Sequence, residues 1–102
     1  MVHEILLKGE NGAITGRDLC TLLNLKPRDL QKLIERERRE GAPICASYDS
    51  RNPGYFLAAT QEEMRIYCGR LRKRAGEIFK TRRACLKSME TLPEEDTWQE
   101  SR

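Results

Sequence analysis

The last two fifths of the sequence open with a strong helix-start signal and then continue for a long stretch without proline. Residues 60–63, Thr-Gln-Glu-Glu, form a capping box, in which the Thr60 hydroxyl meets the backbone at Glu63 and the Glu63 carboxylate reaches back. The next proline is Pro93, so the helix can extend for roughly 30 residues, or about 45 Å. A chain of 102 residues forms one small domain. Such a domain is too small to cover a helix of this length.

The composition is that of a highly charged chain with a small core. Hydrophobic residues make up 38%, charged residues 34% and aromatic residues 6% of the sequence, which predicts a mainly aliphatic core and well-solvated helices. No apolar run has the length of a membrane-spanning helix or of the apolar region of a secretory signal. We therefore expect no membrane segment and a cytoplasmic protein.

The cysteines and the single histidine do not have the spacing of a metal or catalytic site. Cys20, Cys45, Cys68 and Cys85 lie far apart, and no Cys-x-x-Cys pair is present. No serine or cysteine lies near His3 in the sequence to act with it as a nucleophile. The sequence also contains no glycine-rich phosphate-binding loop. We expect no enzyme, no metal and no cofactor, and four reduced thiols, mostly packed as small hydrophobic side chains.

The net charge of +3 conceals an uneven distribution. Residues 90–102 hold five acidic residues and one arginine, whereas residues 65–87 hold nine lysines and arginines opposed only by Glu77. A positive field of this size suits a polyanion such as nucleic acid. The alternative is a solvated helix face with no ligand.

Before the long helix, the hydrophobic spacing changes from that of helices to that of strands. The pattern predicts three helices: residues 2–8, a helix capped by Thr15 that ends near Leu23, and a helix from Pro27 to Glu40. After Gly41 it predicts two strands: residues 42–47 and 55–58, joined by a loop with its tip at Asp49–Gly54. The expected fold is therefore mainly α with a small β-hairpin.

The long helix carries apolar residues every seven positions, at Met64, Leu71, Ile78 and Cys85. Further apolar residues flank them: Tyr67, Ala75, Phe79, Leu86 and Met89. This spacing predicts a homodimer through Leu71, Ile78, Phe79 and Leu86, which would otherwise lie in water. Arg74 and Arg82 lie on or near the same face, and these two charged residues argue against a coiled coil. The alternative is that the first half packs on the core and the second half frays.

Two sequence motifs resemble a known family of DNA-binding modules. Residues 16–44, GRDLCTLLNLKPRDLQKLIERERREGAPI, are followed by GYFL at 54–57. The pattern resembles the biotin-repressor type of module, in which E-G-x-P-I follows the recognition helix and G-Y-x-L closes the wing. More closely, residues 1–89 resemble small prophage-associated winged-helix proteins of Gram-positive bacteria. The resemblance implies a winged helix-turn-helix followed by a long C-terminal helix.

Two positions depart from the family pattern. The family often has an apolar residue at the position of Glu37, so we expect Leu33 to supply that packing here. The start of the recognition helix, usually rich in serine, is Lys-Pro-Arg-Asp at 26–29. The base contacts of the family are therefore not assumed for this chain.

The third helix and the hairpin loop hold the candidate DNA contacts. A helix in the major groove uses its first turns for bases and phosphates, which selects Lys26, Arg28, Gln31 and Lys32. Arg36 and Arg39 lie on the same arc, and Arg51 and Asn52 lie at the tip of the wing, where they can reach a phosphate or the minor groove. The alternative is an exposed helix in which Glu35 forms local ion pairs with Arg38 or Arg39.

The residues and the resemblance together predict a double-stranded-DNA-binding protein, and the resemblance implies a transcriptional or replication-associated regulator of a prophage. Its expected parts are a winged helix-turn-helix over 1–59, a basic helix over 60–92 and an acidic disordered tail over 93–102 that contains Trp98. The alternative is a protein-interaction adaptor on the same scaffold, with no DNA affinity of its own. A DNA binder loses affinity steeply as salt rises, whereas an apolar interface does not.

Overall fold

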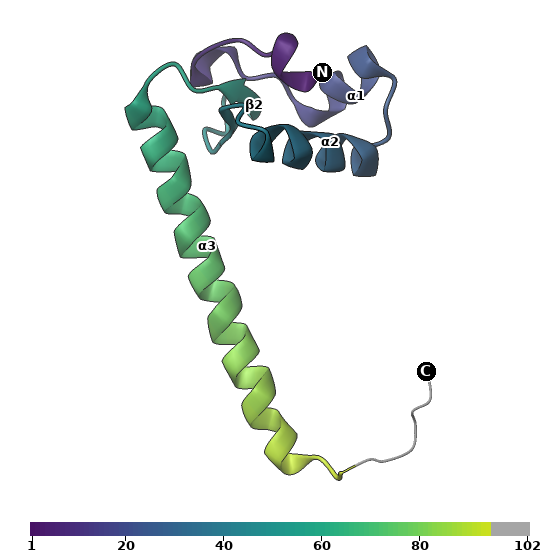
Figure 1. The fold of residues 1–102 in the computed structure, drawn as a ribbon, viewed down its shortest axis with the longest axis vertical. Helices are drawn as coiled ribbons and strands as arrows, with labels where there is room; N and C mark the ends of the chain where they lie inside the picture. Colours follow the sequence, from purple (N-terminus) through teal and green to yellow (C-terminus); the bar gives the residue numbers. More distant parts are fainter. Residues whose placement is uncertain (95–102) are drawn as a thin grey trace. The chain divides into compact units, whose positions relative to one another are not determined.

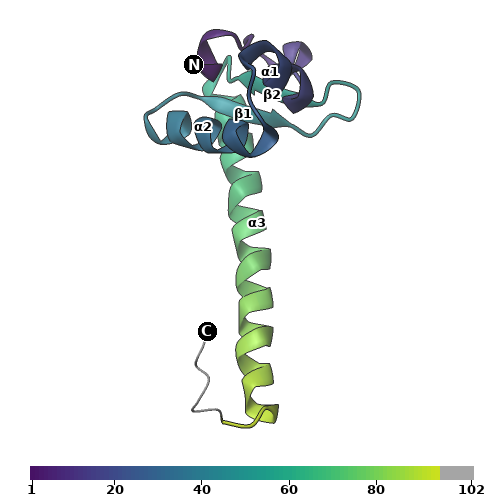
Figure 2. The ribbon, with the colours of Figure 1, turned by 90° about the vertical axis from the view of Figure 1, so that its right-hand side faces the viewer.

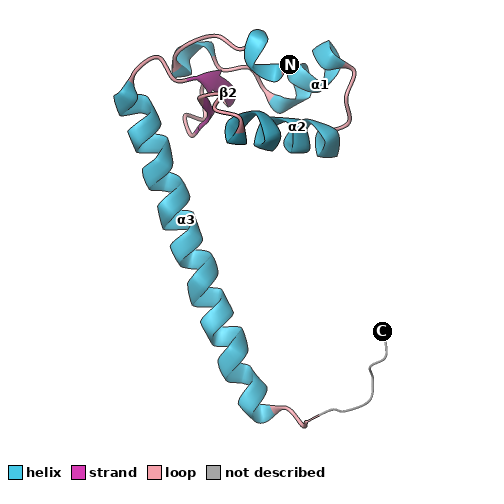
Figure 3. Ribbon diagram, viewed as in Figure 1, coloured by secondary structure: helices cyan, strands magenta, loops and turns pink. Residues whose placement is uncertain are grey.

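The computed structural model describes residues 1–94, which are mainly helical with one antiparallel hairpin (Figure 1, Figure 3). The chain divides into two compact units, Met1–Gly69 and the part that begins at Arg70. None of the helices in the described part is long and apolar enough to cross a membrane. The elements follow in this order: the 3-10 helices η1 (Val2–Glu4) and η2 (Glu10–Gly12), α1 (Gly16–Leu23), α2 (Pro27–Arg39), β1 (Ile44–Ser47), β2 (Gly54–Leu57), α3 (Gln61–Ser88) and η3 (Met89–Thr91).

The prediction of a helix over residues 2–8 is wrong. Helical structure there is limited to η1, and the chain then runs beside β2. The Leu57 amide donates to the Leu7 carbonyl oxygen at 2.8 Å, and the Gly9 amide donates to the Leu57 carbonyl oxygen at 2.9 Å. These backbone groups are therefore occupied by β2. A helix over 2–8 would compete with both hydrogen bonds. The positions of the apolar residues within this short segment could not reveal a pairing with a strand so distant in the sequence.

The two predicted helices that follow are confirmed, with their caps. The backbone amide of Asp18 donates to the Thr15 hydroxyl at 3.1 Å, and α1 ends at Asn24 in the left-handed conformation, with φ of 55°. Helix α2 has Pro27 as its first residue. The next residue after its C-cap is Gly41, whose φ of 108° is a conformation that favours glycine.

The hairpin is also confirmed: β1 is two residues shorter than predicted, and β2 has the predicted length but begins one residue earlier. Ile44 pairs with Leu57 at one end and Ser47 pairs with Gly54 at the other, and the connecting loop extends beyond the strands (Figure 2). Gly54 has a φ of 123°, and a Cβ there would lie 2.2 Å from the carbonyl oxygen of Ile14. Only glycine fits this close approach between β2 and the segment before α1.

The first unit has two groups of buried side chains. The larger group joins η1 and the segment just after it to α1, α2 and β1: Val2, Leu6, Leu19, Leu30, Ile34 and Ile44. The smaller group consists of Cys45 from β1, Phe56 from β2 and Tyr67 from α3, with Met64 packed against it. Tyr67 and Met64 therefore belong to the core, so the start of α3 packs within the first unit, and the predicted self-association residues begin only at Leu71. Their seven-residue relation to Leu71 and Ile78 could not distinguish the two roles.

The capping box at the start of α3 forms as predicted, with one difference. The Glu63 amide donates to the Thr60 hydroxyl at 3.1 Å, and the Glu63 carboxylate accepts from the amide of Ala59 at 2.6 Å, one residue before the expected partner. Helix α3 continues to Ser88, and the side chains from Leu71 to Glu94 are all exposed. Most of the predicted acidic tail, with Trp98, lies outside the described residues.

Candidate nucleic-acid interface

Helix α2 separates its side chains into a buried face and an exposed basic face. Leu30, Ile34 and Glu37 are almost completely buried. Because they fix the rotation of the helix, the opposite side is held toward solvent. Four of the predicted DNA contacts are exposed there: Arg28, Lys32, Arg36 and Arg39, and we call these four residues the basic row of α2. Lys26, the N-cap residue of α2, is exposed just before it.

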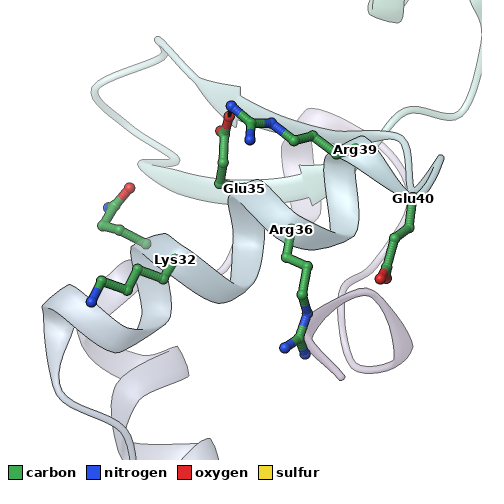
Figure 4. A pocket seen from close by; sticks show the side chains of 6 residues that line it. Lys32, Glu35, Arg36, Arg39 and Glu40 are labelled. Carbon is green, nitrogen blue, oxygen red and sulfur yellow. Dashed lines mark ion pairs between the residues drawn. The ribbon is translucent and has the colours of Figure 1, made fainter.

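The charges of the basic row are only partly neutralised. Arg39 Nη2 lies 3.0 Å from Glu35 Oε2, one turn earlier, so the ion pair predicted as the alternative use of Glu35 does form. Figure 4 shows Arg39 bent back over Glu35. Arg36 points away from this ion pair, and Lys32 extends toward the amino-terminal end of α2. These side chains border a shallow, open hollow along the helix, which is lined by Gln31, Lys32, Glu35, Arg36, Arg39 and Glu40.

Gln31 is held by the hairpin. Its Nε2 donates to the Tyr55 hydroxyl at 2.8 Å, while the Tyr55 side chain packs against the larger core group. The Tyr55 ring therefore fixes β2 against the core. Its hydroxyl in addition fixes the direction of a predicted base contact. This bond spans 24 residues in sequence and no local pattern indicates it.

A second hollow lies between α1 and α2. It is lined by a basic residue, Arg17, that is not among the predicted DNA contacts. Its volume is about 410 Å³, and it brings Arg17 and Thr21 of α1 next to Pro27 and Gln31 of α2. Arg17 is exposed in the first turn of α1. The signal available in the sequence was its place in the first turn of the helix that precedes the basic row.

In the hairpin loop, Arg51 is bound to a neighbouring acid. The Arg51 guanidinium donates from Nε and Nη2 to the Asp49 carboxylate at 3.2 and 3.3 Å, and the Arg51 amide donates to Asp49 Oδ1 at 2.9 Å. These hydrogen bonds from Arg51, with one from the Asn52 side chain, hold the pKa of Asp49 below its ordinary value. Arg51 and Asn52 both lie in the loop between β1 and β2, where the sequence places the tip of the wing. A phosphate would have to compete with Asp49 for the guanidinium.

Glu37 is buried, and it was not expected to pack in the core. The expectation that Leu33 would replace it is incomplete, because Leu33 is only half-buried while Glu37 is fully buried. Its carboxylate accepts hydrogen bonds at 2.8 Å from each of the amides of Val2 and His3, and His3 Nδ1 lies 2.6 Å from Oε1. The pair of amides explains how a charged group is tolerated there.

The pKa of Glu37 reflects two opposing effects. Burial acts to raise it, but the hydrogen bonds from the backbone of His3 and Val2 and the interaction with the His3 ring together lower it below its ordinary value of 4.5. Glu37 therefore ties the amino terminus to the buried side of α2 as a carboxylate. The basic row lies on the other side of the same helix.

The thiols are less uniformly packed than predicted. Cys45 is buried and Cys20 is half-buried, whereas Cys68 and Cys85 are exposed. Burial, with a smaller effect from the Glu63 carboxylate, raises the pKa of Cys45 to about 11, so this side chain is an unreactive thiol at neutral pH. Within residues 1–94, no group of three His, Cys, Asp or Glu side chains could hold a metal ion.

The comparisons with known proteins give no information on the function of this chain. No family model, no curated protein and no solved structure matches this chain.

Proposed function

We propose that this protein binds double-stranded DNA as a winged helix-turn-helix. The observation that carries the proposal is the basic row of α2, held toward solvent by the burial of Leu30, Ile34 and Glu37 on the opposite side. A single exposed helix with a row of cations has the size and charge that the major groove accepts. In this reading α2 is the recognition helix, and the β1–β2 hairpin is the wing.

The first turns of α2 have the side chains needed for both kinds of contact with DNA. Lys26, Arg28 and Lys32 are exposed and are suited to phosphates, while Arg can also pair with guanine and Gln with adenine through two hydrogen bonds. Gln31 would reach a base from a fixed position, because Tyr55 already orients its amide. Arg17, in the first turn of α1, would add a phosphate contact at the edge of the same surface.

The wing would make a weaker contact. Arg51 is exposed at the hairpin loop but is paired with Asp49, so it gains less from a phosphate than an unpaired arginine does. We assign the main share of affinity in the first unit to α2. By analogy with the proteins that the sequence resembles, the biological role would be regulation of transcription or replication for a prophage, in the cytoplasm.

The experiment is a titration of a fluorescent mixed-sequence duplex with the full chain, followed by anisotropy at low and near-physiological salt. We expect micromolar or tighter binding at low salt that weakens steeply as salt rises. The double variant Arg28→Ala, Lys32→Ala should lose at least about tenfold in affinity and show a shallower salt dependence. The matched control is Lys8→Ala, Arg65→Ala, which removes the same charge from exposed positions of the first unit outside the basic row.

Two results would count against this function. One is the absence of binding at low salt, which would favour the adaptor, a winged-helix scaffold that binds only proteins. The other is an equal loss of affinity in both double variants, which would show that net charge matters and the position on α2 does not.

A further inference from the structure

We infer that a second copy of this chain covers the apolar side of α3, with the two helices antiparallel. The inference goes beyond the proposed DNA binding and does not depend on it. It concerns the face formed in the second unit by Leu71, Ala75, Ile78, Phe79, Cys85 and Leu86, which we call the apolar face of α3. Ile78 and Phe79 are 60% and 58% exposed. Side chains of this size at this spacing are typical of a helix with a partner.

The spacing on this face is that of a two-helix interface. Leu71, Ile78 and Cys85 recur every seven residues, and Ala75, Arg82 and Met89 form the second series three or four residues away. Lys73, Lys80 and Lys87 follow the same seven-residue interval on the opposite side of the helix. Burying the apolar face against a second copy therefore leaves the lysines in water.

The charges along the helix favour the antiparallel direction. Residues 70–74 contain four cations and no acid, whereas Glu90 and Glu94 follow the end of α3. A parallel pair would place the two basic starts together and Arg82 beside Arg82 of the second copy. An antiparallel pair places the basic start of each copy next to the acidic end of the other.

The seven-residue interval favours a second copy over a membrane. Basic amphipathic helices also bind anionic lipid surfaces. An anionic surface would attract the basic residues of 70–88, but it would repel Glu90 and Glu94 and would give no use to the seven-residue interval. Lipid binding by a monomer is therefore the competing outcome of the test.

Full overlap of the apolar segments sets the register. Residues 71–89 have their centre at Lys80, and an antiparallel pair centred there places Leu71 opposite Met89 of the second copy and Ala75 opposite Cys85. Arg82 then lies opposite Ile78, where its aliphatic stem can pack while the guanidinium remains at the edge. The two Cys85 residues are ten positions apart in this arrangement, or about 15 Å, too far for a disulfide.

The first test is the oligomeric state of the full chain without DNA, measured by sedimentation equilibrium. We expect a species with twice the monomer mass of 11.8 kDa. Ile78→Asp should raise the dissociation constant at least about tenfold, with helical circular dichroism retained. Ala84→Asp is the matched control, because it adds the same charge on the side of Lys80 and Lys87. A wild-type protein that stays monomeric, or a monomer that binds phosphatidylserine-rich vesicles, would overturn the inference.

The second test determines direction and register by oxidation. In a background with Cys20→Ser and Cys68→Ser, Ala75→Cys should form an intermolecular disulfide with Cys85 under a mild oxidant. The same background with Ala75 unchanged should remain uncrosslinked on a non-reducing gel. A crosslink through Cys85 alone would demonstrate parallel helices, and a dimer in which Ala75→Cys gives no crosslink would contradict this register.

Discussion

Glu37 is a charged residue inside the core, and its role follows from the groups around it. Its carboxylate satisfies the amides of Val2 and His3, both at 2.8 Å. Without an acceptor, each of these donors would lose its hydrogen bond at a partly or fully buried site. A buried unsatisfied donor costs about 1–3 kcal/mol, so the two hydrogen bonds make Glu37 a stabilising residue at this position.

We therefore predict that Glu37→Gln lowers the free energy of unfolding by about 1–3 kcal/mol at neutral pH, because the glutamine amide has only one acceptor oxygen for the two amides. The measurement is urea unfolding followed by circular dichroism. Glu40→Gln is the control: Glu40 is an exposed carboxylate at the end of the same helix, and its substitution should change the stability by less than about 0.5 kcal/mol.

The difference in the free energy of unfolding between wild type and Glu37→Gln should decrease as the pH falls. The pKa of Glu37 in the folded protein lies below the ordinary value of 4.5, so the unfolded chain binds a proton first as the pH falls. The stability due to ionised Glu37 is complete above the ordinary value and is lost as the pH falls through the folded pKa. The gap between wild type and Glu37→Gln should thus narrow in acid. A gap of constant size from pH 7 to pH 3 would refute this role.

At the scale of the elements, the tightest constraint is the contact between β2 and the segment before α1. The amides of Ile14 and Tyr55 each donate to the carbonyl oxygen of the other, at 2.9 and 2.8 Å. Gly54 makes this pairing possible, because a Cβ there would lie 2.2 Å from the Ile14 carbonyl oxygen. The same strand supplies Tyr55, whose hydroxyl orients Gln31 of α2.

We predict that Gly54→Ala destabilises the protein by more than about 2 kcal/mol, since the clash adds to the unfavourable positive φ. Thermal unfolding followed by circular dichroism measures this effect. Gly41→Ala is a matched comparison, because Gly41 also has a positive φ but a Cβ there would meet nothing within 4 Å. The loss at Gly54 should clearly exceed the loss at Gly41, and equal losses would show that the close approach to Ile14 has no energetic weight.

Elements with local signals were predictable from the sequence, and contacts between distant residues were not. Thr15, Pro27 and Thr60 mark helix starts by chemistry confined to one turn, and each start is where the sequence predicts it. The exposed basic row was predictable for the same reason, as the remainder of a helix whose apolar side is known. The hydrogen bond of the Leu7 carbonyl oxygen with β2 was not, because its partner, Leu57, lies fifty residues away.

The candidate site shows the same limit. The presence of Arg28 and Lys32 on one exposed face follows from helical spacing. The bond between Gln31 and Tyr55 and the hollow shared with Arg17 depend on how separate elements pack. Tyr67 illustrates the converse, since its spacing suited a self-association face as well as a core, and only the contact with Phe56 and Cys45 decides between them.

At the scale of the whole molecule, charge is divided unevenly between the two units. Residues 1–69 contain ten basic and ten acidic residues, whereas residues 70–88 contain eight basic residues and one acidic residue. The net positive charge therefore comes from α3, while the candidate contacts with DNA bases come from α2. Long-range attraction to DNA and recognition of its groove thus have separate sources.

The two proposals together predict a specific effect of separating the copies. A dimer carries two copies of α2, and a duplex long enough for both should bind it with an advantage that a short duplex lacks. Ile78→Asp should therefore weaken binding to the long duplex by about tenfold or more, and binding to a short duplex by less than about twofold. Anisotropy titrations of both duplexes with the full chain measure this difference.

The control and the opposite variant make the outcome specific. Ala84→Asp adds the same negative charge to α3 and should lower the affinity for both duplexes equally and slightly, because it leaves the apolar face intact. Arg28→Ala with Lys32→Ala should weaken both duplexes while the protein stays dimeric. If Ile78→Asp instead affects both duplexes as Ala84→Asp does, then one α2 accounts for the binding, and the dimer serves some purpose other than holding two recognition helices on one DNA.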